Sequence, residues 1–159
     1  MPDMYIWLIL CFVGPFVFIA VVWPRIIGWH ALAKRYRTRE CHEGLSFSFA
    51  TLLRFGGLCG YMNCISVRVG EQGLRIALSP PSSLLLGLGH PPLFIPWTAI
   101  ASCERKQRMF GSVTILQIKD PNVTLAIGSL WGPLSETIHQ IWELRQEAEK
   151  LGKAGAAPG

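Results

Sequence analysis

Cysteine and histidine side chains are the residues of this chain whose types and spacing come closest to a metal site. Cys41 and His42 are adjacent, and Cys59 and Cys64 follow them. Thiolate and imidazole groups are ligands that Zn²⁺ prefers. However, Cys64 falls on the strand face opposite to Ile65, and the five cysteines of the chain form an odd, irregularly spaced set. We therefore interpret them as reduced thiols and expect neither a metal nor a disulfide framework.

Catalytic signatures are missing from the sequence, which contains no phosphate loop, dinucleotide fingerprint or nucleophile elbow. Glu71, Glu104 and Asp120 fall in or near expected turns and strand ends, where solvated surface charge is the ordinary interpretation. The run from Gly56 to Gly60 opens no helix, so it lacks the donors of an anion site. His90 stands between a glycine and a proline, which indicates a turn residue. The sequence predicts no catalytic residue and no cofactor, so we interpret the chain as a non-enzyme.

Basic side chains gather in one expected hairpin, where Arg105, Lys106 and Arg108 precede Phe110. A solvated hairpin is the ordinary interpretation, and we favour it. The functional alternative is contact with anionic lipid headgroups or with an acidic protein partner. Nucleic acid is not expected, because no aromatic stacking surface is interleaved with these charges.

A leucine-rich stretch is more apolar than an ordinary loop. Leu84, Leu85 and Leu86 are followed by Leu88 and by the apolar segment 93–95. One interpretation is burial, with a short strand at the three consecutive leucines. The other is a surface patch that enters a membrane or binds a partner.

The elements that would position these residues begin with an apolar segment at Met4–Trp23, which contains 20 residues and no charge. A helix of this length spans roughly 30 Å, the hydrocarbon thickness of a bilayer. Tyr5, Trp7 and Trp23 stand near its ends, as interfacial aromatic residues do. A cleaved signal peptide would need basic residues before the apolar core and small residues after it, and both are missing. We therefore expect a transmembrane helix.

Basic residues set the expected orientation of this helix. None precedes it, whereas Arg25, Lys34, Arg35, Arg37 and Arg39 follow it closely. The positive-inside rule puts the C-terminal side in the cytoplasm and the N-terminus outside. We expect the plasma (inner) membrane of a bacterium as the location, with Lys34, Arg35 and Arg37 near anionic headgroups.

Residues 25–39 predict a basic juxtamembrane amphipathic helix, because Ile26, Trp29 and Tyr36 recur with helical spacing. Gly28 lowers the helix propensity and is the expected place of a bend. We expect the apolar face of this helix to pack on the following domain or on the membrane interface.

From Leu45 onward the apolar pattern has a period of two, which is typical of strands. In the first of them, Phe47 and Phe49 fall on one face and Ala50 on the other. We expect Phe49, together with Val67, Leu125 and Ile138 of later elements, to face one shared interior. Turns rich in glycine, proline or asparagine separate the later strands. The expected strands are 45–55, 61–69, 74–78, 93–95, 97–105, 113–118 and 123–127, with a further short one at 84–86.

One helix is expected at 133–150, where Leu134 and Ile138 belong to an apolar stripe and Ser135 is the expected N-cap. Antiparallel strands must close or cover their edges, so about seven strands and one helix indicate a small bent β-barrel with a capping helix. The predicted fold is α+β and mainly β. Its parts are a transmembrane helix (4–23), a juxtamembrane helix (25–39), the barrel domain (45–150) and a disordered tail (151–159).

Several segments resemble bacterial membrane-anchored proteins of the pleckstrin-homology (PH)/GRAM superfold. Residues 73–79 (GLRIALS) and 90–100 (HPPLFIPWTAI) carry the resemblance, and residues 28–36 and 61–69 are similar as well. The resemblance implies a PH/GRAM-like barrel and a non-enzymatic binding or scaffolding module without an assigned ligand. Phosphoinositide-binding PH domains carry basic residues around the first hairpin loop, whereas residues 55–60 carry no charge. A dedicated phosphoinositide pocket is therefore not expected.

The predicted function is that of a membrane-tethered module at the cytoplasmic face of the membrane, acting through lipid or protein contacts. The alternative is a small accessory subunit of a larger membrane complex, assembled through the apolar helix around Gly14-Pro15. The expected partners are the membrane itself, spanned once, and either anionic headgroups or a membrane protein.

Overall fold

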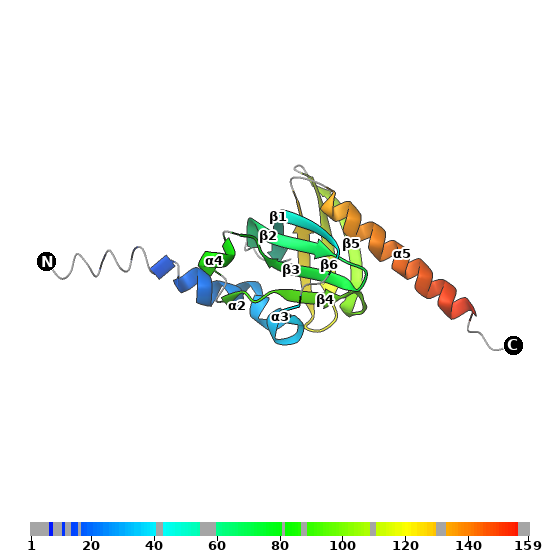
Figure 1. Ribbon diagram of the computed structural model, residues 1–159, viewed down its shortest axis with the longest axis horizontal. Coiled ribbons are helices and arrows are strands. Elements are labelled where there is room, and N and C mark those ends of the chain that lie inside the picture. Colours follow the sequence, from blue (N-terminus) through cyan, green and yellow to red (C-terminus); the bar gives the residue numbers. More distant parts are fainter. Residues whose placement is uncertain are drawn as a thin grey trace.

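The computed structural model describes residues 7, 11, 14–15, 17–40, 43–54, 60–80, 82–86, 89–108, 111–129 and 133–155. One antiparallel seven-stranded sheet, in the order β4-β3-β2-β1-β7-β6-β5, curls into a half-barrel, and a C-terminal helix follows it (Figure 1). The mainly β fold with a terminal helix is therefore confirmed. The strands are β1 (Leu45–Arg54), β2 (Gly60–Val69), β3 (Gly73–Leu78), β4 (Leu93–Pro96), β5 (Ile100–Arg108), β6 (Gly111–Ile118) and β7 (Val123–Gly128).

Two irregularities in the β1–β2 pair bend the sheet. The pairing passes from Phe47 opposite Val67 to Ala50 opposite Ile65, so β1 carries one extra residue there. A second shift follows between Ala50 and Leu52. Bulges bend a strand and increase its twist. The end of β1 thereby pairs with β7 as well as with β2, which joins the two halves of the sheet.

The first bulge overturns the side-chain alternation expected for β1. Phe49 has a φ of 59° and is 54% exposed, whereas Ala50 and Leu52 are buried. An extra residue moves every later side chain of a strand to the opposite face. The prediction that Phe49 lies in the core is wrong for this reason.

The hydrophobic core lies between the sheet, α3 (Trp29–Tyr36) and α5 (Leu134–Gly155). Val67, Leu125 and Ile138 are fully buried in it, as the sequence pattern predicts. Trp29 and Leu32 of α3 join the same core, each 1% exposed. Of the two expected packing surfaces, the domain and the membrane interface, α3 uses the domain. The helix expected at 25–39 is divided at Gly28 and ends at Tyr36.

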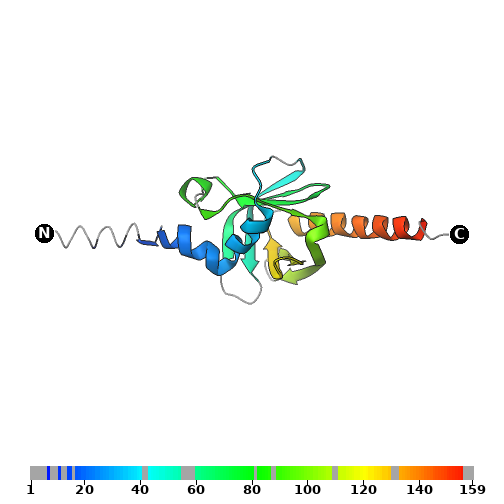
Figure 2. The ribbon, with the colours of Figure 1, turned by 90° about the horizontal axis from the view of Figure 1, so that it is seen from below.

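The N-terminal elements leave the barrel at the end opposite to α5, as the two perpendicular views agree (Figures 1 and 2). They are a π-helical turn, η1 (Phe18–Val22), and α2 (Trp23–Ile27), which precede α3. Gly28 lies between α2 and α3 with a φ of 83°, a conformation that glycine adopts without steric cost. The bend expected at this glycine is confirmed.

The expected transmembrane helix at 4–23 falls largely outside the described residues. In the part of the chain that the structure describes, no helix has both the length and the apolar character needed to cross a membrane.

Two strand predictions need correction. A short helix, α4 (Ser82–Leu86), replaces the strand expected at 84–86. Leucine is a strong helix former, and the Ser83 N–H begins the turn by donating to the Ser79 carbonyl at 3.0 Å. The strand expected from Trp97 starts only at Ile100, because residues 97–99 form a 3₁₀ turn, η3 (Trp97–Ala99).

The boundaries of α5 also differ from the prediction. Ser135 lies buried inside the first turn instead of capping it. The helix continues through 151–155, so the expectation of a disordered tail is wrong for these residues, and 156–159 lie outside the described part. Leu151 and Ala154 are good helix formers and outweigh the intervening glycine.

Candidate functional site

A wide groove of about 1280 Å³ lies between α5 and the β2–β3 turn. Both apolar and charged side chains line its walls. The apolar ones include Leu45, Val69, Trp97, Ile141, Trp142 and Leu144, and the charged ones are Glu43, Arg68, Glu71, Arg145 and Glu149.

Close backbone packing shapes the floor of this groove. A Cβ atom at Gly70 would lie 2.4 Å from the carbonyl oxygen of Glu43, and one at Gly73 would lie 2.3 Å from the carbonyl oxygen of Ile95 in β4. Neither position has room for a side chain. The Trp97 indole donates to the Gly70 carbonyl at 3.0 Å, and its ring centroid is 6.3 Å from that of Trp142. The β2–β3 turn, η3 and α5 are thereby held together.

The groove exposes apolar side chains next to charged ones. Leu45 and Leu144 are 60% and 65% exposed, and the Arg145 guanidinium donates to the Glu71 carbonyl across the groove. Apolar side chains flanked by charges match an amphipathic segment of another molecule.

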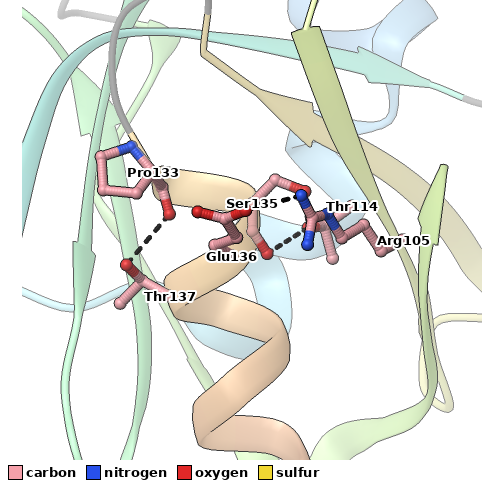
Figure 3. A network of polar contacts seen from close by, with 6 residues as sticks. All are labelled: Arg105, Thr114, Pro133, Ser135, Glu136 and Thr137. Atoms are coloured by element: carbon pink, nitrogen blue, oxygen red, sulfur yellow. Dashed lines mark hydrogen bonds and ion pairs between the residues drawn. The ribbon is translucent and has the colours of Figure 1, made fainter. Parts of the chain in front are cut away.

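The predicted basic loop is partly engaged within the domain. Arg105 on β5 meets Glu136 in the first turn of α5, with Nη2 and Oε1 2.7 Å apart (Figure 3). Lys106 lies 3.7 Å from the carboxylate of Glu104. Arg108 ends β5, and its side chain lies outside the described part. Arg105 therefore fastens β5 to α5.

The basic residues of α3 lie beside the β6–β7 turn. Arg35 is 3.5 Å from the Asp120 carboxylate, and the Tyr36 hydroxyl donates to the Asp120 carbonyl. Lys34 and Arg37 are exposed, and the Arg37 backbone forms a bridge with Leu93 at the edge of β4. Arg35, Tyr36 and Arg37 border a groove of about 670 Å³, whereas Lys34 does not line it.

The leucine-rich stretch lies apart from both basic sets. Leu84 is 87% exposed on α4, which stands at the end of the barrel where η1 and α2 leave it (Figure 1). The side chains of Leu85 and Leu86 lie outside the described part. The three sets of predicted contact residues thus occupy three separate places.

A buried aromatic cluster was not predicted from the sequence. Trp29 of α3, Tyr61 of β2 and His90 pack edge to face, with centroid separations of 5.2–5.6 Å. The Tyr61 hydroxyl is hydrogen bonded to His90 Nε2, and the Trp29 indole donates to the Pro91 carbonyl at 3.1 Å. Burial raises the pKa of Tyr61, so its hydroxyl stays protonated. His90 is thus more than the turn residue that its neighbours indicated.

The described cysteines are free thiols with no metal site around them. Cys64 and Cys103 are unpaired, and within the described part no three His, Cys, Asp or Glu side chains are placed to hold a metal ion. Cys41, His42 and Cys59 lie outside that part. Burial, with a smaller effect of Glu143, raises the pKa of Cys103 to about 12. This thiol is therefore a poor nucleophile near neutral pH.

No protein-family model matches the chain, and no curated protein is significantly similar to it.

Proposed function

We propose that the chain is a membrane-tethered, non-enzymatic PH/GRAM-like module that binds a partner at the cytoplasmic face of the membrane. The apolar segment Met4–Trp23 would be the tether, and the basic residues after it would keep the domain inside. The curled sheet with a terminal helix is compatible with a PH-like barrel. The resemblance carried by residues 73–79 and 90–100 favours the same fold.

The observation that carries this proposal is the opposite placement of the two ends of the domain. The N-terminal helices leave from one end, and α5 projects from the other (Figures 1 and 2). The large groove is lined by α5 residues from Ile141 to Glu149. A tether at the first end would leave this groove open to the cytoplasm. A short tether also raises the effective concentration of a weakly bound membrane partner.

Affinity purification of the full chain from detergent-solubilised membranes tests the binding function. The variant Leu144→Arg places a charge in the groove, and Met62→Arg is its matched control, because Met62 is also exposed, at 70%, on β2. We expect a stoichiometric partner with the wild type and the control, and its loss from the groove variant. Retention of the partner by Leu144→Arg would exclude the groove and favour the accessory-subunit alternative, in which the N-terminal helix makes the contact.

A further inference from the structure

Apolar side chains are exposed around the N-terminal end of the barrel. Phe18, Val21, Val22 and Ile26, in η1 and α2, are 45%, 48%, 38% and 46% exposed, and Leu84 on α4 is 87% exposed. Both views place α4 at the end of the barrel from which η1 and α2 leave (Figures 1 and 2). An exposed leucine alone would need no explanation, but here it stands at the same end of the domain as four exposed apolar side chains of η1 and α2.

Charge is sparse on this surface. The sequence of α4, Ser-Ser-Leu-Leu-Leu, has no ionisable side chain, and Arg25 is the single one in residues 18–27. The Arg25 guanidinium donates back to the Val21 carbonyl at 3.4 Å. A mostly apolar surface with an arginine at its rim matches the boundary between hydrocarbon and headgroups, where long basic side chains reach towards water. A charged protein partner would have few ionisable side chains on this surface with which to form ion pairs.

The aromatic cluster fastens α3 to the segment that follows α4. α3 follows α2 directly, and its Trp29 donates to the Pro91 carbonyl at 3.1 Å, just after α4. The Thr38 N–H donates to the Pro92 carbonyl at 2.9 Å. On the other side of α4, the Ser79 N–H donates to the Cys64 carbonyl of β2 at 2.7 Å. A helix that enters a bilayer at Trp23 would therefore bring α4 to the bilayer with it.

From these contacts we infer that α4 is a second membrane contact, which lies in the interfacial layer of the same bilayer as the tether. This inference rests on the proposed membrane tether. Two contacts joined through Trp29 hold the barrel at one tilt and direct the groove along α5 away from the lipid. The inferred contact is α4 and not the basic residues of β5, of which Arg105 is paired with Glu136.

Lipid photo-crosslinking of the full chain in phosphatidylcholine vesicles tests the inference. A photoreactive benzoylphenylalanine replaces Leu84 in one sample and Leu144 in a matched control, which is 65% exposed at the far end of the domain. We expect several-fold more lipid adduct from position 84 than from position 144, with no change when phosphatidylglycerol is added or the salt is raised. An apolar contact is insensitive to both.

Alkaline carbonate extraction of the same vesicles separates failure of the tether from failure of the α4 contact. Extraction of the chain from the vesicles would overturn the tether, and the α4 contact with it. Retention of the chain, with equally little adduct at both positions, would overturn the α4 contact alone. Crosslinking of position 84 mainly to protein would also overturn it, in favour of a protein interface.

Discussion

Arg105 on β5 and Glu136 in the first turn of α5 form an ion pair with a nitrogen–oxygen distance of 2.7 Å. Their side chains are 35% and 49% exposed, so water screens the attraction. A double-mutant cycle with Arg105→Ala and Glu136→Ala should give a coupling free energy of about 0.2–1 kcal/mol in denaturant unfolding. Lys106→Ala, on the neighbouring residue, should show no coupling to Glu136. Equal coupling for both bases would mean that Arg105 has no special contact with α5.

The bulge at Phe49 should reverse the usual order of stability of the alanine and glycine variants at a strand position. At a φ of 59° an alanine is strained and a glycine is not. Phe49→Gly should therefore be more stable than Phe49→Ala by about 1 kcal/mol. At Phe47, which has an ordinary strand φ, the alanine variant should be the more stable one by about 0.5–1 kcal/mol. The same order at both sites in urea unfolding would contradict the bulge.

The shared core makes a further prediction about α5. Ile138 is fully buried, so Ile138→Ala should lower the free energy of unfolding by about 2–5 kcal/mol. Leu144 on the same helix is 65% exposed, and Leu144→Ala should change it by no more than about 0.5 kcal/mol. Thermal unfolding of a chain that begins at Arg25 measures both. Similar losses for the two variants would mean that α5 packs along its whole length.

Cys103 provides a prediction about pH. With a pKa of about 12, about one thiol in a thousand is ionised at pH 9, against about half at the ordinary value of 9.0. Alkylation by iodoacetamide at pH 9, followed by mass spectrometry, should therefore be a few hundredfold slower in the folded chain than in urea. Because folding raises the pKa, the unfolded state loses its proton first. The free energy of unfolding should fall as the pH rises from 9 towards 12.

Substitutions at two glutamates of α5 test the cause of the slow alkylation of Cys103. Its negative charge contributes to the raised pKa, so Glu143→Gln should make Cys103 react faster. Glu147→Gln, one turn further along α5, should leave the rate unchanged. If Cys103 in the folded wild type reacts as fast as in urea, the thiol is not buried as described.

Much of the fold follows from local sequence pattern. Val67, Leu125 and Ile138 were placed in the core by alternation and helical spacing alone. When a strand or helix is regular, its periodicity determines which face of the element each side chain occupies. Phe49 shows where they fail, because a bulge depends on the pairing of β1 with both β2 and β7, and one strand does not reveal that pairing. The helical turn at Leu84 likewise depends on the Ser79 carbonyl being within reach.

The candidate site was much less predictable. The groove joins Glu43, the β2–β3 turn and the second half of α5, which are far apart in the sequence. No motif marks it, since its shape depends on packing between distant elements. The aromatic cluster is similar, because Trp29 and His90 come together only once α3 packs on β2. The basic residues were found by composition, but their ion pairs with Asp120 and Glu136 were not.

The membrane tether and its orientation are the centre of this account, and paired reporter fusions test them most directly. One fusion carries a phosphatase that is active only outside the cytoplasm, and the other carries a reporter that fluoresces only inside, each placed after Gly159. The basic residues from Arg25 to Arg39 predict a fluorescent fusion and an inactive phosphatase, both recovered in carbonate-washed membranes. An active phosphatase with a dark fluorescent fusion, or recovery of both fusions in the soluble fraction, would contradict the account.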